Sequence, residues 1–364
     1  MKFKLDAVLI EEDCRTSTLA ARVAGAIPSF VELRYVADGR HAARPLPGAD
    51  DAFGAGKRRM VVMRRRGPFL MGCPAASAEF ACCGYLVLVL ASNCPMDCSY
   101  CFLQEHLANN PGFQVYANYH DAFGELDRLQ RGAGGRQLRV GTGELADSLA
   151  FDELTGMSID LVSYFAEREN LLLELKTKTD EIGNLLSIDP RGRTLVSWTL
   201  SPQRVFEACE HGTASPAARI NAARRLHEAG YKVGFHLDPV IAYAEAARDY
   251  LELLDNLFTI VPPKGIAFIS IGGLRMTPGL RTAARRRFPH DPMLLGEEVL
   301  SGDGRFRTFA PLRLRLFTSL RERIVKARAD LPVYLCMESA SAHLQVIGAA
   351  AASPATLGSR LAGG

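Results

Sequence analysis

The sequence predicts an α/β protein built on a partial (β/α)6 TIM-like barrel, with an N-terminal and a C-terminal extension. Two observations favour this fold. From Tyr85 onward, short β-branched or Leu-rich runs alternate with helix-length amphipathic stretches, which is the rhythm of a parallel sheet. Six such strand-sized runs can be counted, and six strands fit a partial barrel.

The strands and helices follow one another along the chain. The candidate strands are residues 85–92, 137–142, 171–175, 194–200, 231–237 and 265–271. The candidate helices are residues 119–130, 154–167, 217–229 and 244–258, where apolar side chains recur at helical spacing. Right-handed crossovers would place these helices outside and gather the C-terminal ends of the strands on one face. We therefore expect the chemistry to lie just after each strand.

The chain divides into four predicted regions. Residues 1–80 form an N-terminal extension packed on the barrel, with a strand at 59–63, and residues 81–278 form the barrel itself. Residues 279–347 form a C-terminal extension that completes the fold, with a helix at 312–327 and a strand at 332–337. Residues 348–364, rich in Ala, Gly and Ser, form a disordered tail.

Composition narrows the class of protein. A chain of 364 residues with 48% hydrophobic content can bury a large core. Nine cysteines are too sparse for a secreted disulfide scaffold, and residues 1–14 lack the apolar stretch of a signal peptide, so we expect a cytoplasmic protein with no membrane segment. The net charge of +3 is too mild to require a polyanionic partner.

The sharpest motif is a CxxxCxxC loop directly after the first barrel strand, formed by Cys94, Cys98 and Cys101 and followed by the aromatic Phe102. Ordinary electron-transfer [4Fe-4S] clusters use four cysteines, so three ligands leave one iron open. S-adenosylmethionine (SAM) can chelate that iron, and an electron from the cluster can then cleave SAM to give a 5′-deoxyadenosyl radical. The motif thus predicts a [4Fe-4S] cluster and SAM as cofactors.

Two other interpretations of the three cysteines stay open. Tetrahedral zinc wants a fourth Cys or His at short spacing, and His106 lies close in sequence. Three buried structural cysteines without any metal are the third interpretation, which the loop position after a strand disfavours.

A second motif is Gly-Thr-Gly-Glu at 141–144, at the end of the second strand. Gly141 and Gly143 would let the backbone approach a ligand, and Glu144 could accept hydrogen bonds from an ammonium group. A plain turn is the alternative. The place of this motif beside the cysteine loop favours contact with SAM.

Polar side chains also follow the later strands, and for each of them a solvated loop residue is the alternative. They are Lys176, Lys178, Thr199, Ser201, His236, Asp238 and Arg275. Lys178 could pair with the SAM carboxylate, and Ser201 could donate a hydrogen bond to SAM. His236 beside Asp238 could be an acid/base pair, but a hydrogen-bonded structural histidine is the favoured interpretation.

The chain resembles the spore photoproduct lyase family of radical SAM DNA-repair enzymes. The similar segments are SAEF at 77–80, CPMDCSYCFLQ at 94–104, DSLAFDELT at 147–155, KTKTDEIGNLL at 176–186 and the run from 198 to 239. The cysteine motif alone marks only the radical SAM superfamily, whereas the later segments indicate this branch.

The resemblance implies a lyase in which the 5′-deoxyadenosyl radical abstracts hydrogen from C6 of a methylene-bridged thymine dimer in DNA. By position, Cys94, Cys98 and Cys101 correspond to the cluster ligands. Lys178 corresponds to a SAM-binding lysine, and Tyr100 to a catalytic tyrosine near the active centre. The full set of expected cofactor-binding residues is Phe102, Gly141, Gly143, Glu144, Lys178, Thr199 and Ser201.

Three departures from the family pattern matter. The family's hydrogen-donor cysteine is replaced by Glu144, its second active-site tyrosine by Phe102, and the serine just beyond the donor by Ala146. The candidates for a substitute donor are Cys73, Cys82, Cys83, Cys209 and Cys336, although a buried structural role is commoner for each. These departures indicate a homologue that acts on another DNA lesion or on another substrate.

The sequence is compatible with three functions. The first is a radical SAM lyase acting on a pyrimidine lesion in damaged DNA, with the lesion flipped toward the barrel and phosphates contacted by Arg275, Arg285, Arg286 and Arg287. A reductant such as flavodoxin or ferredoxin would supply the electron. The second keeps the radical chemistry on a small molecule, peptide or RNA, and the third is a zinc- or cluster-bearing nucleic-acid binding protein.

Overall fold

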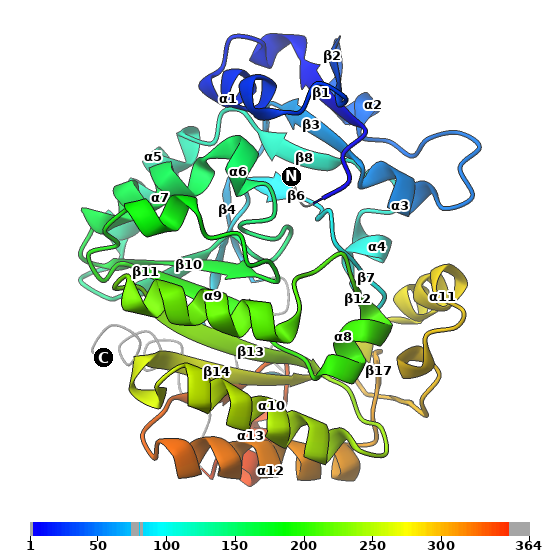
Figure 1. The fold of residues 1–364 in the computed structure, drawn as a ribbon, viewed down its shortest axis with the longest axis vertical. Coiled ribbons are helices and arrows are strands. Elements are labelled where there is room, and N and C mark those ends of the chain that lie inside the picture. The colour runs from blue at the N-terminus through cyan, green and yellow to red at the C-terminus, as the bar shows by residue number, and fades with distance from the viewer. Residues whose placement is uncertain (1–2, 74–79, 81–82, 349–364) are drawn as a thin grey trace.

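A computed structural model of the chain describes residues 3–73, 80 and 83–348. Figure 1 shows an N-terminal sheet at the top and a larger curled sheet below it. The N-terminal sheet has the order β2-β1-β3-β8-β6. Its strands are β1 (Ala7–Glu11), β2 (Glu32–Val36), β3 (Arg59–Met63), β8 (Phe113–Tyr116) and β6 (Ala91–Ser92). All of its pairs are parallel except β6 with β8.

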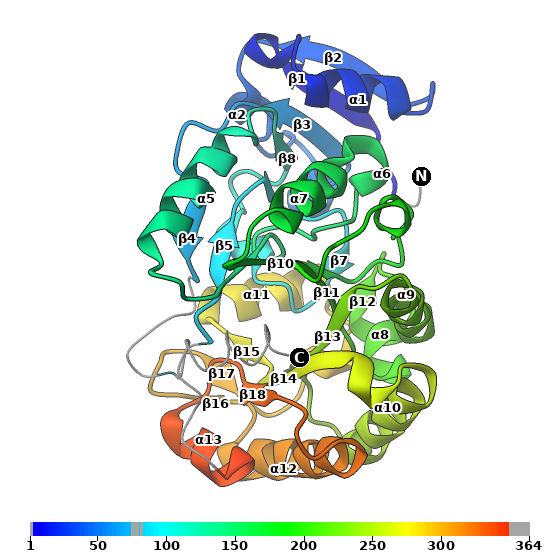
Figure 2. The ribbon, with the colours of Figure 1, turned by 90° about the vertical axis from the view of Figure 1, so that its left-hand side faces the viewer.

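The larger sheet has the order β18-β14-β13-β11-β10-β9-β5-β4. Its strands are β4 (Leu70–Gly72), β5 (Leu86–Leu88), β9 (Leu138–Gly141), β10 (Leu171–Thr177), β11 (Thr194–Thr199), β13 (Lys232–Val240), β14 (Ile266–Gly273) and β18 (Val333–Leu335). Only the edge pair β4 and β5 is antiparallel. The sheet curls into a half-barrel, visible in Figure 2, so the predicted partial barrel is confirmed.

Helices cover the outside of the half-barrel, as right-handed crossovers require. They are α5 (Asp121–Gly132), α6 (Asp152–Thr155), α7 (Met157–Ala166), α9 (Pro216–Glu228), α10 (Ala246–Ile260), α12 (Ala310–Ala327) and α13 (Ala340–Ile347). The helix predicted over 154–167 is two helices, because Gly156 adopts a left-handed backbone with φ of 59°. The C-terminal ends of the strands form the open edge, which we call the mouth.

The run predicted as one strand over 85–92 belongs to both sheets. Its first part is β5 of the barrel, and its last two residues are β6 of the N-terminal sheet. Between them, the Val89 N–H donates to Phe69 O at 2.8 Å, and Leu90 O accepts from the Tyr116 N–H at 3.1 Å. The hydrogen bonds of this short segment therefore pass from one sheet to the other, and no sequence pattern marks the change.

In each sheet, strands from different predicted regions pair with one another. The N-terminal sheet takes β8 and β6 from beyond residue 80, and β18 of the predicted C-terminal extension pairs with β14 of the barrel. Buried apolar side chains of both sheets form one core cluster. The boundaries at 80 and 278 stay predictions, and the predicted disordered tail lies outside the described residues apart from Gly348. None of the described helices is both long and apolar enough to span a bilayer.

Candidate active site at the mouth of the barrel

The cysteine loop begins at Asn93, directly after β6. Asn93 has φ of 72°, a left-handed conformation that asparagine adopts more readily than most residues. Its side chain donates to Pro111 O at 2.6 Å and accepts from the Cys94 N–H at 2.8 Å, while its own N–H donates to Leu145 O at 2.8 Å. Asn93 thus ties the start of the loop to the segment after β9.

A short antiparallel ladder holds the middle of the loop. Strand β7 (Asp97–Cys98) pairs with β12 (Glu210–His211), so that Cys98 lies opposite Glu210. The Ser99 N–H donates to Cys209 O at 2.8 Å, and the Cys101 N–H donates to Cys98 O at 3.1 Å. Cys98 is buried, and Cys94 and Cys101 are half-buried.

The donor set fits a [4Fe-4S] cluster held by three cysteines. All three thiols are free of disulfides, and they stand on one loop whose middle is fixed by the ladder of β7 and β12. Burial is the main cause of the raised pKa values of Cys94 and Cys98, and the pKa of Cys98 is raised to about 12. Bound iron would displace these protons.

A single-ion site has weaker support. Among the described residues, no group of three or more His, Cys, Asp or Glu side chains is arranged to hold one metal ion. Each cysteine of a cluster ligates a different iron, so its ligands need not converge on one point. His106, the fourth ligand of the zinc alternative, is exposed and packs its ring against Phe102 with centroids 6.2 Å apart.

Glu210 joins the cysteine loop to the barrel. Its carboxylate accepts hydrogen bonds from the Tyr100 hydroxyl, from Lys178 Nζ at 2.8 Å and from Ser201 Oγ at 2.9 Å. The Glu210 side chain is fully buried, and so is that of Arg219, whose Nη2 lies 2.5 Å from Glu210 Oε2. The cations Lys178 and Arg219 hold the pKa of Glu210 well below its usual value, although burial opposes them.

Several predicted residues therefore meet around Glu210. Lys178 Nζ also donates to the Tyr100 hydroxyl at 2.7 Å, so the predicted lysine, tyrosine and serine share one hydrogen-bonded cluster. Thr199 lies beside it at the end of β11, and its carbonyl accepts from Arg219 Nη1 at 2.8 Å. Phe102 lies at the surface, with 39% of the residue exposed.

The glycine motif begins at the last residue of β9, the strand that pairs with β10. A Cβ added to Gly141 would come within 2.1 Å of the Tyr85 hydroxyl, and one added to Gly143 within 2.5 Å of Lys176 Cβ. Both glycines therefore allow close packing inside the protein. Glu144 is half-buried, and the pKa of Lys176 is raised because the charges of Glu144, Asp238 and other acidic groups together outweigh the opposing effect of burial.

His236 takes the structural state favoured from the sequence. Its Nδ1 lies 2.6 Å from Ser270 Oγ, and its Nε2 lies 2.9 Å from Glu174 Oε1, all inside the barrel. Asp238 does not contact it through a hydrogen bond; it forms an ion pair with Arg275 at 2.9 Å instead. His236 and Asp238 therefore do not form an acid/base pair, and each takes part in a separate interaction.

The buried histidine predicts a pH dependence of stability. Burial and nearby Lys176 lower the pKa of His236 from 6.5 to about 4. Between these values the unfolded chain binds a proton that the folded chain does not, so stability falls as the pH drops from 6.5 to 4, by up to about 3 kcal/mol. Urea unfolding of the wild type and His236→Gln at pH 7 and pH 5 should show a smaller difference at pH 5. An equal difference at both pH values would contradict this assignment.

The four predicted DNA-binding arginines differ in their surroundings. Arg287 has 7% of its side chain exposed and pairs with Asp51 and Asp97, while Arg275 is held by Asp238. Arg285 donates to Leu294 O at 3.0 Å. Arg286 is exposed and forms no ion pair with any of the described residues. Its role in DNA binding stays a prediction, as do those of the other three.

The candidate substitute donors are also spread out. Cys336 lies at the mouth, with its sulfur 3.9 Å from Arg275 Nη2, and Cys83 accepts from Arg139 Nη2 at 3.0 Å. The Cys209 thiol is buried and donates to Asp291 Oδ1 at 3.6 Å. Cys73 is half-buried, and Cys82 lies outside the described residues.

Sequence reasoning missed Glu210, Arg219 and Asp147. Asp147 Oδ2 accepts from the Lys178 N–H at 2.8 Å, and its Oδ1 accepts from Thr177 Oγ1 at 2.7 Å, so it fixes the end of β10. Both acids lie inside segments that resemble the family. Nothing in their local pattern distinguishes them from solvated loop residues.

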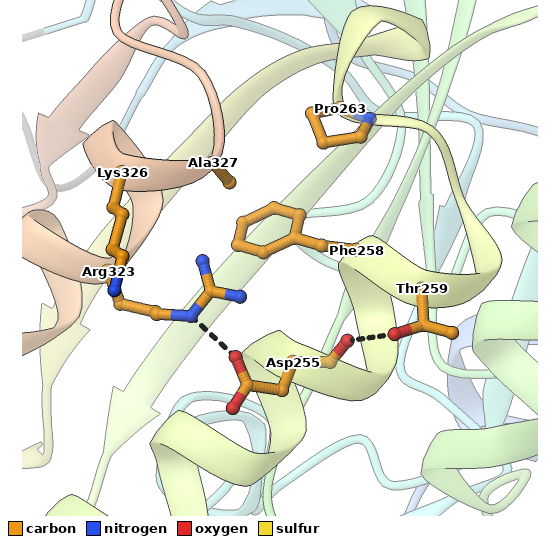
Figure 3. A pocket seen from close by; sticks show the side chains of 7 residues that line it. All are labelled: Asp255, Phe258, Thr259, Pro263, Arg323, Lys326 and Ala327. Carbon is orange, nitrogen blue, oxygen red and sulfur yellow. Dashed lines mark hydrogen bonds and ion pairs between the residues drawn. The ribbon is translucent and has the colours of Figure 1, made fainter.

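An open surface depression lies away from this site, between the C-terminal parts of α10 and α12 (Figure 3). Arg323 crosses it, paired with Asp255 and 5.2 Å from the ring of Phe258. Pro263 on its rim precedes β14, so the depression is at the end of the barrel opposite the mouth.

Sequence comparison matches the chain to spore photoproduct lyases. The family model described as spore photoproduct lyase matches residues 5–301. The chain is 26% identical to the spore photoproduct lyase of Clostridium acetobutylicum over 273 residues, which are 74% of this chain and 78% of that protein. It is 24% identical to that of Bacillus subtilis over 225 residues, 61% of this chain and 64% of that protein.

Solved structures match the fold. A mutant spore photoproduct lyase with bound AdoMet and dinucleoside spore photoproduct gives a TM-score of 0.81 at 22% identity, covering 92% of this chain and all of the other. A second spore photoproduct lyase structure, complexed with dinucleoside spore photoproduct, gives 0.80 at 21% identity, again covering 92% and 100%.

Proposed function

The chain belongs to the spore photoproduct lyase family, and on that premise we propose that it is a radical SAM lyase that repairs a thymine-derived lesion in DNA. The observation that carries the proposal is the cysteine loop, in which three free thiols lie at the mouth of a half-barrel beside the Tyr100, Lys178 and Glu210 cluster. AdoMet and the dinucleoside spore photoproduct are bound in the similar solved structures.

In this proposal Cys94, Cys98 and Cys101 hold the [4Fe-4S] cluster. When bound, the cluster and SAM supply the radical chemistry. Lys178 and Ser201 orient the carboxylate of SAM, and Gly141, Gly143, Glu144, Thr199 and Phe102 complete its surroundings. Lys178 is held by Glu210 and Tyr100 before any ligand arrives, so less side-chain entropy is lost on binding.

Binding of duplex DNA is proposed for the surface formed by α11 (Pro278–Arg287) and the hairpin β16 (Val299–Leu300) and β17 (Phe306–Arg307). Strand β17 pairs with β15 (Arg275–Met276), and Arg307 donates to Met337 O at 3.1 Å, which fixes the hairpin beside the mouth. Val299 and Leu300 are 50% and 56% exposed. Apolar side chains of this kind can insert between base steps and help a lesion leave the stack.

Arg286 provides the sharpest test of DNA binding. Because it is exposed and unpaired within the described residues, Arg286→Ala should weaken binding of irradiated DNA several-fold and lower the salt slope of log Kd by about 1. Arg225→Ala is the control, since Arg225 is also exposed but lies on α9, outside the half-barrel. Equal affinity of Arg286→Ala and the wild type at several salt concentrations would exclude a phosphate contact.

A second substrate class is favoured by one residue. Glu144 occupies the position of the family's donor cysteine, and a carboxylate cannot return a hydrogen atom as a thiol does. The alternative is therefore a radical SAM enzyme that acts on a small molecule, a peptide or RNA.

Product analysis distinguishes the two proposals. The reconstituted protein is incubated anaerobically with SAM, a chemical reductant and dinucleoside spore photoproduct, and the nucleosides are identified by mass spectrometry. Formation of thymidine from the photoproduct supports the lesion-repair proposal. Formation of 5′-deoxyadenosine while the photoproduct stays intact would support another substrate.

A further inference from the structure

A buried lysine from the N-terminal region reaches the cysteine loop. Lys57 follows α3 (Ala52–Gly56) and has 3% of its side chain exposed. Its ammonium donates to Met96 O and lies 3.1 Å from Asp97 Oδ1, so both of its polar partners lie between Cys94 and Cys98. A lysine is rarely this buried without a compensating anion.

A second cation holds the same loop from the C-terminal side. Arg287 of α11 lies 2.9 Å from Asp97 and 2.8 Å from Asp51, and its Nη1 donates to Gln104 Oε1 at 3.2 Å. Gln104 in turn donates to Ser99 O at 2.8 Å. The loop is thus held by charged groups from both extensions of the barrel.

The charges around Asp97 are not equally screened. Asp97 has 30% of its side chain exposed, whereas Lys57 has 3%, so water weakens the field of the carboxylate more than that of the ammonium. Lys57 contacts the loop at Met96 and Asp97, between the ligands Cys94 and Cys98, so its field reaches both of them. Toward the sulfurs, Lys57 therefore acts as a net positive charge.

We propose that Lys57 is a positioning residue that holds the cysteine loop and makes the cluster bound there easier to reduce. This inference rests on the proposed function, since it presumes the cluster. A [4Fe-4S] cluster with three thiolates is anionic, and reduction adds a further negative charge. A fixed cation in a buried site stabilises the reduced form more than the oxidised form.

The test compares variants that change the charge in opposite directions. Lys57→Met keeps the aliphatic stem and removes the cation, and Asp97→Asn keeps the lysine and removes its counter-ion. The midpoint potential of the reconstituted cluster is measured by anaerobic redox titration with detection by electron paramagnetic resonance. We expect a more negative potential for Lys57→Met and a more positive one for Asp97→Asn. Lys264→Met, an exposed lysine just before β14 at the far end of the barrel, should match the wild type.

The outcomes separate tuning from simple loop packing. If Lys57 only packed the loop, both variants would lose iron without opposite shifts in potential, and the proposal would be overturned. If Lys57→Met does not retain iron, Asp97→Asn decides alone, and an unchanged or more negative potential overturns the proposal. A wild type that binds no cluster defeats the proposed function as well, whereas a wild-type cluster with unshifted variants defeats only the role of Lys57.

Discussion

Replacing Cys98 by alanine is expected to abolish the cluster absorbance and SAM cleavage together, both to background. Cys98 is buried and held by the β7 and β12 pairing, which fixes its place in the loop. With two remaining ligands the site cannot hold a cubane. Iron content, the visible spectrum and 5′-deoxyadenosine formation after anaerobic reconstitution measure the effect.

Cys209→Ala is the matched control for this variant. Cys209 is equally buried and directly precedes β12, but its thiol donates to Asp291. We expect the variant to retain iron and SAM cleavage. Loss of iron from both variants would point to general destabilisation of the loop, and retention of the cluster by Cys98→Ala would contradict the assigned ligand set.

Removal of the Glu210 carboxylate is expected to destabilise the protein by about 3–5 kcal/mol, because it leaves the fully buried Arg219 without its counter-ion. Glu210→Ala would also release Tyr100 and Lys178, which both bond to that carboxylate. The free energy of unfolding in urea measures the first effect. The second should appear as a raised Kd for SAM in the reconstituted protein.

Glu228→Ala provides the comparison, on the helix α9 that carries Arg219. Glu228 pairs with Arg224 of α9 at 2.6 Å, but both side chains are at least 40% exposed. Exposed pairs of this kind contribute under about 0.5 kcal/mol. If Glu210→Ala cost no more than Glu228→Ala, the buried pair would not be the anchor of the site.

The barrel could be predicted because its strands are marked locally. Buried parallel strands are nearly continuous apolar runs, and the six runs of that kind all appear as strands of the structure. The split of residues 85–92 between two sheets could not be predicted, since it depends on hydrogen bonds to Phe69 and Tyr116, which are distant in sequence.

The site was predictable only where a motif marks it. The three cysteines stand at a recognisable spacing, and Lys178, Tyr100 and Ser201 were reached through position and resemblance. Glu210 was missed because β12 has only two residues and its bond to Tyr100 spans 110 positions. The partners of Arg287 are equally remote: Asp51 lies 236 residues away, so one arginine of a basic run that looks solvated is instead paired inside the protein.

Whether the three cysteines hold a cluster with one open iron can be decided by a single experiment. The reconstituted protein is reduced anaerobically, and its electron paramagnetic resonance spectrum is recorded with and without SAM, together with the iron content. We expect about four irons per chain and a spectrum that changes when SAM is added. A spectrum that does not change when SAM is added, or a chain that takes up one zinc ion in place of iron, would contradict a cluster with one open iron.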